Sequence, residues 1–441
     1  MERYHVLLSQ LGFDSCVVIA GEYHSRDATT LSKAKLYTAL RQVVLEHGAL
    51  GMQVRTGKRS SDIPQFVHLS SVDLDTAVEF RDDKGLGMDE LLRSELERQF
   101  QFDISSPLWH LTVLGGRTVI FAYHHVIADG QSGPAFLSAL LSALNSPGGL
   151  SHSGGGSMIQ IPFDVPIFGP VEAYTNVFPS LSELSHTIYK MAVPSSWTEG
   201  PYAWTGNPIP RVPNLAMAVR TWQLSAADTT ALLRLCRAHD TTLTAFLYTL
   251  VVGVLSRLVG QPRTIATTIA VSLRRFTGAP PAVLCDHVCS TQAYVPLCPV
   301  DRATGFPWAA TAQYAARVRE AVARSRDVLG MLRLLLWLGM GEAYFRGMLG
   351  KKRESGITLS NLGKFPTSGT GEPSGGDVWM LKNVYLGQCD VVRGAAIKVN
   401  VVGSPEGTTN IAFTYGQDSI DADLAEEFIR EVKSTLYAVL S

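Results

Sequence analysis

One stretch of this sequence constrains the fold more than any other: an apolar run that ends in two histidines and leads through a short loop into a helix. The run TVIFAYHH (118–125) has the β-branched and aromatic residues of a buried strand. Two glycines and an arginine separate it from a second apolar run, 108–114, and this pattern predicts a hairpin. VIADG follows, and then a predicted helix, SGPAFLSALLSALNSPGG. A buried strand that leads through a loop into a helix predicts a layered fold with a pocket at the junction.

The rest of the chain also mixes predicted strands and helices. With 441 residues, of which 46% are hydrophobic, the chain is long enough for two domains of about 200 residues each. The amino-acid composition changes near the middle of the chain, where a segment rich in Pro, Gly and aromatic residues predicts a linker. We therefore expect an α/β, or layered α+β, fold of two domains, each a mixed sheet flanked by helices. The expected boundaries are 1–190 for the N-terminal domain, 191–215 for the linker and 216–441 for the C-terminal domain.

Charge and hydropathy exclude several classes of partner. Lysine plus arginine total 38 and aspartate plus glutamate total 39, so the basic excess of a nucleic-acid-binding protein is missing. The start, MERYHVLLSQLGFDS, lacks the features of a secretory signal peptide. In the apolar stretch GMLRLLLWLGMGEAYF, only eight residues lie between Arg333 and Glu342, against the ~18 that a membrane span needs. We expect a soluble, cytoplasmic monomer without a membrane span.

The two histidines allow several kinds of chemistry. Alternation along a strand puts His124 and His125 on opposite faces, so at most one of them enters a given pocket. A metal site needs at least three converging ligands, and no third ligand pattern lies nearby. Cys285 and Cys289 are close in the sequence, but no second cysteine pair or histidine cluster accompanies them. We therefore predict no metal. The alternative to a functional site is a hydrogen-bonded pair of core histidines, with Asp129 capping the helix entry.

An acid–base role suits the same residues. A histidine of near-neutral pKa can take a proton from an attacking hydroxyl or amine, provided that it is held in one orientation. Asp129 could hold the ring, as in a triad, or it could brace the loop by pairing with a distant arginine. Gly130 removes a side chain where a substrate must pass close to the backbone. A serine hydrolase is a rival interpretation of DGQSGP, but Pro134 stands where the nucleophile-elbow pattern needs glycine.

HHVIADG resembles the HHxxxDG signature of the acyltransferase superfamily with the chloramphenicol acetyltransferase-like fold. That superfamily includes fungal and yeast alcohol acetyltransferases, plant BAHD acyltransferases, phthiocerol dimycocerosyl transferases and nonribosomal peptide condensation domains. The resemblance extends, in family order, to GFDSCVVIAGEY, FDISSPLWHLTVL, CRAHDTTLTAFLYTL, VSLRR and ITLSNLG. The DFGWG sequence of the plant branch is absent, and YLGQCD occupies a similar late region. The chain is therefore most similar to the alcohol acetyltransferase or dimycocerosyl-transferase-like branch.

The resemblance implies two chloramphenicol acetyltransferase-like domains with the active-site channel between them. It implies that His125 is the general base, which deprotonates the acceptor for direct attack on a thioester carbonyl. His124 and Asp129 would then be structural, with Asp129 paired to an arginine of VSLRR. We expect Arg274 to be that partner, with Arg275 as the second choice.

The resemblance also implies substrate contacts. Gly130 would leave room for the donor thioester, and Ser360 and Asn361 would lie near the channel and bond the substrate or the developing oxyanion. The alternative for Asn361 is a turn residue before Gly363.

The donor is expected to be acyl-CoA, used as a co-substrate and not as a bound cofactor. Lys351, Lys352 and Arg353 could bind its phosphates, although basic residues at a solvated helix end are the common alternative. A carrier protein would use a similar basic surface, but the chain has no adjacent carrier domain, which favours CoA. The acceptor would be a small-molecule alcohol, such as a secondary metabolite, and the acyl group acetyl or another short or medium chain. The alternatives are N-acylation, a carrier-protein donor, or a non-catalytic member that binds a carrier protein.

Overall fold

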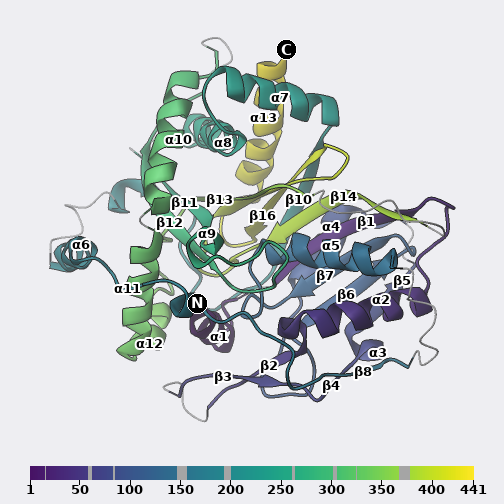
Figure 1. The fold of residues 1–441 in the computed structure, drawn as a ribbon. Helices are drawn as coiled ribbons and strands as arrows, with labels where there is room; N and C mark the ends of the chain where they lie inside the picture. Colours follow the sequence, from purple (N-terminus) through teal and green to yellow (C-terminus); the bar gives the residue numbers. More distant parts are fainter. Residues whose placement is uncertain are drawn as a thin grey trace.

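The structure is a computed structural model that describes residues 1–14, 16–57, 62–82, 85–146, 156–192, 200–260, 264–300, 305–323, 325–366 and 378–441. It is a mixed α/β fold in which two large sheets are flanked by helices, as the sequence predicts (Figure 1). The first sheet contains β14 (Trp379–Gln388), β1 (Val17–Ser25), β7 (Thr118–Tyr123), β6 (Trp109–Leu114) and β5 (Val78–Arg81), in that order. The hairpin predicted around the two glycines is β6–β7.

The first sheet is buried on both faces because its strands are apolar at consecutive positions. Val17 and Ile19 of β1 belong to one hydrophobic core, and Val18 and Ala20 belong to another. The first core lies under α2 (Lys33–Glu46) and α5 (Ser132–Leu144), and the second under α4 (Met88–Leu96). This double burial is what fixes β7, and therefore the end of the histidine strand, in place.

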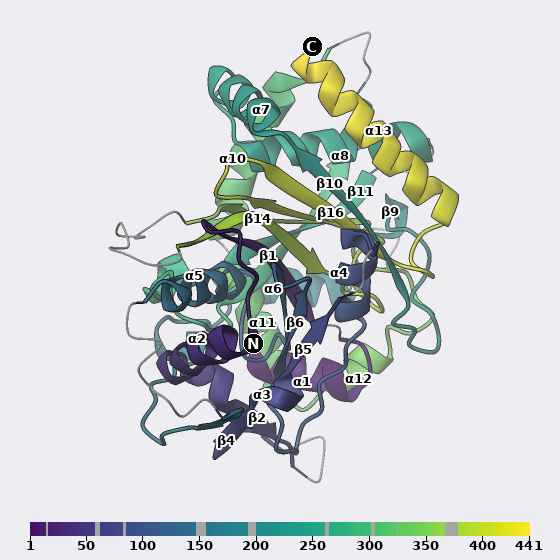
Figure 2. The ribbon, with the colours of Figure 1, turned by 90° about the vertical axis from the view of Figure 1, so that its right-hand side faces the viewer.

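The second sheet carries most of the remaining chain. It contains β10 (Met217–Leu224), β16 (Thr409–Gly416), β15 (Ile397–Gly403), β13 (Ile357–Lys364), β11 (Thr264–Ser272) and β12 (Val288–Pro296), with β9 (Ala203–Trp204) beside β11. Its main core is shared with α7 (Ala226–Ala238), α8 (Leu243–Val259) and α13 (Ala422–Leu440). Both views show these helices at the end of the molecule away from α2 (Figures 1 and 2).

Smaller elements complete the described chain. Two two-stranded sheets are formed by β2 (Met52–Arg55) with β3 (Gln65–His68) and by β4 (Ser71–Asp73) with β8 (Met158–Gln160). The remaining α-helices are α1 (Glu2–Gln10), α3 (Leu74–Ala77), α6 (Leu181–Ala192), α9 (Arg274–Thr277), α10 (Trp308–Ala323), α11 (Ser325–Trp337) and α12 (Gly341–Arg346). Single turns of 3-10 helix occur at Gly48–Gly51, Val171–Ala173 and Gly200–Tyr202.

Two segments lie across the boundaries that the sequence predicts. Strand β14, from the C-terminal half, pairs with β1 along its whole length and so belongs to the first sheet. Helix α1, from the N-terminal half, packs its leucines in a cluster with Ile209, Phe345 and Met348. A single cut between 190 and 216 therefore does not separate the two sheets, and the predicted boundaries remain a prediction about domains.

Within the described residues, no single helix is long and apolar enough to cross a membrane. The consecutive helices α7 and α8, which meet at 95°, pass such a test together by length and composition alone.

Candidate active site

The histidine motif forms a compact loop between β7 and α5. The backbone N–H of His124 donates to the carbonyl oxygen of Leu108 at 2.9 Å, which extends the β6–β7 pairing by one residue. The hydroxyl of Tyr123 donates to the carbonyl oxygen of Asp129 at 2.8 Å and so ties the end of the loop back to the strand. The loop is rigid because both of its ends are held by buried hydrogen bonds.

His124 and His125 have separate surroundings, but strand alternation is not the cause: β7 ends at Tyr123, and His125 lies in the turn that follows. The Nδ1 of His124 accepts the backbone N–H of Val126 at 3.0 Å, and Phe102 meets the ring edge-on. An accepting Nδ1 carries no proton, so this ring is neutral in that arrangement. Burial lowers the pKa of His124 to about 4. His124 therefore supports the loop and is unsuited to hold a proton at neutral pH.

Asp129 and Arg274 form the ion pair that the sequence led us to expect. The guanidinium of Arg274 donates from Nε to Oδ2 of Asp129 at 3.1 Å and from Nη2 to Oδ1 at 2.8 Å. Its Nη1 donates to the carbonyl oxygens of Pro280 and Val283. Both side chains are buried, so the pair ties the motif loop to α9 of the second half. Asp129 faces Arg274, and it is a different aspartate that lies beside His125.

Ser132, the serine of DGQSGP, is part of the same network. Its side chain is fully buried, its Oγ donates to Oδ1 of Asp129 at 2.9 Å, and it accepts from Nη2 of Arg274 at 2.9 Å. A hydroxyl engaged in this way braces a buried ion pair, which gives no support to the serine hydrolase interpretation.

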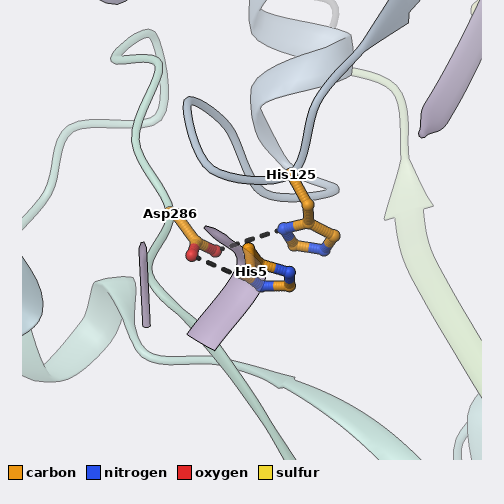
Figure 3. Close-up of side chains that lie close together, drawn as sticks. All are labelled: His5, His125 and Asp286. Atoms are coloured by element: carbon orange, nitrogen blue, oxygen red, sulfur yellow. Dashed lines mark ion pairs between the residues drawn. The ribbon is translucent and has the colours of Figure 1, made fainter. Parts of the chain in front are cut away.

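His125 lies beside two residues that the sequence did not bring to attention, His5 of α1 and Asp286 (Figure 3). Nδ1 of His125 is 3.3 Å from Oδ1 of Asp286, and Nε2 of His5 is 3.6 Å from Oδ2. The two imidazole rings stack with centroids 4.2 Å apart and planes 5° apart. Nδ1 of His5 meets Oδ2 of Asp14 at 3.3 Å. In Figure 3 the second ring nitrogen of His125 points away from Asp286.

The carboxylate controls the protonation of this cluster. Burial alone would lower the pKa of His125, but the contact with Asp286 and its negative charge outweigh burial and raise the pKa to about 9. Burial and the charge of His125 lower the pKa of His5 to about 3. Burial would raise the pKa of Asp286, but the neighbouring histidines hold it below its ordinary value. His125 is therefore a strong base next to a carboxylate that stays ionised at neutral pH.

These three residues also show that a third potential metal ligand lies near His125, contrary to what the sequence predicts. One ligand atom from each of His5, His125 and Asp286 lies within 4.8 Å of the others, so a third group does lie near His125. The lone pair of an imidazole nitrogen lies in the ring plane, and two parallel stacked rings direct their lone pairs side by side. Side-by-side lone pairs are a poor fit to a tetrahedral zinc site, and the prediction of no metal stays a prediction.

Gly130 and Gln131 bring the motif loop against the second half of the chain. A Cβ added at Gly130 would lie 3.0 Å from Cδ2 of Leu362 and 3.1 Å from Nε2 of Gln388. The side-chain amide of Gln131 donates to the carbonyl oxygen of Leu362 at 3.2 Å. A side chain at this position would therefore press on the ends of Leu362 of β13 and Gln388 of β14, so Gly130 lets the motif loop lie close to both strands.

Ser360 is buried on β13, and its predicted contact with substrate remains a prediction. Asn361 is occupied: its amide donates to Oγ1 of Thr244 at 3.0 Å, and its Oδ1 accepts the N–H of Gly363 at 2.8 Å. Gly363 has φ +77°. This geometry fits the alternative that Asn361 is a turn residue, because its polar atoms already have partners.

The three basic residues predicted to bind CoA have different surroundings. Lys351 and Lys352 are exposed, and Lys352 donates to the carbonyl oxygen of Gly200 at 3.0 Å. Arg353 is buried and donates to the carbonyl oxygens of Asn207, Val392 and Gly394, and burial lowers its pKa to about 10. The prediction of a basic surface cluster therefore fails for Arg353, because local carbonyl groups hold its guanidinium inside the protein.

Comparisons with known proteins agree with the geometry. The profile of the alcohol acetyltransferase family matches residues 1–436. The probable alcohol acetyltransferase crmB of Aspergillus fumigatus is 25% identical over 456 aligned residues, which cover 96% of this chain and 95% of that protein. The probable alcohol acetyltransferase FCK4 of Fusarium pseudograminearum is 27% identical over 424 residues, which cover 88% of this chain and 83% of that protein.

Solved structures show the same fold at low sequence identity. The trichothecene 15-O-acetyltransferase TRI3 from Fusarium sporotrichioides superposes with a TM-score of 0.67 and 12% identity, over 99% of this chain and 93% of that chain. The condensation domain of the Monacolin K polyketide synthase MokA superposes with a TM-score of 0.61 and 14% identity, over 99% and 95% of the two chains. The predicted two-domain, chloramphenicol acetyltransferase-like fold is thus confirmed. The chain belongs to the alcohol acetyltransferase family.

Proposed function

We propose that this protein transfers an acyl group, acetyl or another short or medium chain, from acyl-CoA to the hydroxyl of a small-molecule acceptor, with His125 as the general base. The single observation that carries the proposal is the pairing of His125 Nδ1 with the buried carboxylate of Asp286 at 3.3 Å. It leaves the other ring nitrogen directed away, on a loop that meets β13 of the second sheet. The names of the family and of the two fungal relatives favour acetyl as the group and an alcohol as the acceptor.

The proposed reaction needs one base and no covalent enzyme intermediate. Nε2 of His125 takes the hydroxyl proton while the oxygen attacks the thioester carbonyl carbon. The tetrahedral intermediate collapses, the carbon–sulfur bond breaks, and His125 returns the proton to the leaving thiolate. Asp286 offsets the positive charge that forms on the ring between these steps. Ser360 remains the proposed donor to the oxyanion, where one such donor is worth about 3 kcal/mol.

The test is product analysis by mass spectrometry. Purified protein is incubated with acetyl-CoA and longer acyl-CoAs against a panel of alcohols and amines, with acyl carrier protein thioesters in parallel. We expect an ester from an acyl-CoA, and we expect His125→Ala to lower the rate by about 10²–10⁴-fold. An amide product, or turnover with the carrier thioester alone, would replace the corresponding part of the proposal. Full activity of His125→Ala would exclude the mechanism, and no product from any pair would favour a carrier-binding protein.

A further inference from the structure

We propose that Asp286 and His5 are positioning residues for His125: the carboxylate of Asp286 holds the proton on Nδ1, and the ring of His5 holds the imidazole plane. Nε2 of His125 is then presented to the acceptor in one orientation. This inference rests on the proposed function, because it assigns roles to the neighbours of the proposed base.

Asp286 is suited to this role by its burial. Its side chain is completely inaccessible to solvent, and its carboxylate contacts His125 at 3.3 Å and His5 at 3.6 Å. A buried carboxylate is stable when a positive partner compensates for the lost hydration. Among the described residues, no hydrogen bond reaches either of its oxygens. Nδ1 of His125 also has no such hydrogen bond, so the two groups form a close ion pair at 3.3 Å, and His5 and the amino group of Met1 further stabilise the ionised carboxylate. An ion pair at this distance favours the ring orientation that directs Nδ1 toward Asp286.

His5 restrains the same ring through its face. The parallel stack at 4.2 Å leaves His125 little room to turn about its Cβ–Cγ bond. His5 is itself fixed, because its Nδ1 contacts Asp14 and α1 is anchored by Leu7, Leu8 and Leu11 in an apolar cluster. The helix at the start of the described chain thus supplies one wall of the site.

The two stacked histidines differ in protonation state. Two stacked imidazolium ions would repel each other, so one ring stays neutral while Asp286 is ionised. The raised pKa of His125 and the lowered pKa of His5 agree with a proton on His125. Other charged groups that act on the cluster include Asp14, Asp390, Glu2 and the amino group of Met1. Since most of these are acidic, the surroundings as a whole favour one positive charge on the pair.

The first variant is Asp286→Asn, which keeps the shape and removes the negative charge. We expect kcat to fall by about 10²–10⁴-fold with little change in KM, because the ring loses its fixed tautomer. We also expect the rising limb of the pH–rate profile to move to lower pH by one unit or more, because the charge that raises the pKa of His125 is gone. A purely structural carboxylate would lower the yield of folded protein without moving that limb.

Two variants of His5 test whether its aromatic face or its ring nitrogens support His125. His5→Phe keeps an aromatic face against His125, and His5→Ala removes it. We expect kcat of the alanine variant to fall by roughly 10–100-fold and that of the phenylalanine variant to fall less. The matched control is His239→Phe, because His239 stacks on Trp308 at 4.2 Å and 7° beside the other core and should leave kcat unchanged. Thermal melting of every variant checks that the fold is retained.

The outcomes separate this inference from the proposed function. If His125→Ala is inactive while Asp286→Asn and His5→Ala keep the wild-type kcat and pH profile, the positioning role is overturned and the base stands. If His125→Ala is fully active, the proposed function itself fails. If Asp286→Asn moves the pH limb but His5→Ala leaves kcat unchanged, the assignment holds for Asp286 and is overturned for His5.

Discussion

His125 shows how one residue can be identified from the sequence while its immediate partners are not. The motif HHVIADG identified the histidine and the aspartate four positions after it, because both lie in one short stretch. The carboxylate that contacts His125 is Asp286, and the ring that stacks on it is His5. Neither stands at a spacing that relates it to the motif, so the sequence alone gave no signal for either. Their role became visible only when the distances were known.

At the residue scale, the raised pKa of His125 predicts an alkaline activity profile. A general base must be neutral to accept a proton, and the free imidazole forms only as the pH rises through its pKa. Because Asp286 raises that pKa to about 9, we expect kcat/KM to increase from pH 7 to pH 9. The measurement is initial rate against pH at fixed ionic strength with a substrate that does not titrate in this range. A rate that is already constant above pH 7 would contradict the assigned charge state.

At the scale of elements, the ion pair of Asp129 and Arg274 joins the motif loop to α9. We expect Asp129→Ala to lower the free energy of unfolding by about 3–5 kcal/mol, because the guanidinium is left buried without its carboxylate. Denaturant unfolding followed by circular dichroism measures the change. The matched control is Glu427→Ala, which breaks the exposed pair with Arg430 on α13 and should cost about 0–1 kcal/mol. Equal stability of Asp129→Ala and the wild type would show that the pair does not brace the loop.

The basic stretch at 351–353 contains one residue, Arg353, whose burial could not be predicted from the local sequence. A run of Lys, Lys and Arg predicts a solvent-exposed basic patch, because charged residues are rarely buried without partners. Three backbone carbonyl oxygens, one at Asn207 and two in the turn that contains Val392 and Gly394, hold the Arg353 side chain inside the protein. This arrangement depends on tertiary structure and has no signature in the local sequence.

At the scale of the whole molecule, β14 makes the two halves of the chain depend on each other. This strand comes from the C-terminal half of the chain and pairs with β1 in the first sheet. It covers the edge of β1, which would otherwise expose unpaired backbone groups. The folding unit is therefore larger than the 1–190 segment that the sequence suggests.

We expect a fragment of residues 1–190 to lack a cooperative unfolding transition or to aggregate, since its sheet would lack β14 and α1 would lack its apolar partners. Calorimetry and near-UV circular dichroism of the fragment and of the full chain provide the measurement. A fragment that unfolds cooperatively near the transition of the full chain would show that the strand exchange is dispensable.

The sequence by itself determined the fold class, the hairpin that presents the histidines and the partnership of Asp129 with Arg274. The first two follow from periodicity and turn residues within short stretches, whereas the ion pair joins distant residues and was expected only because both motifs resemble those of a known family. The tertiary structure alone decided the partners of His125, the inward turn of Arg353 and the exchange of β14. The physical reason is that these contacts join segments far apart in the chain. Whether two such segments meet depends on how the sheets and helices pack, and no local pattern records that outcome.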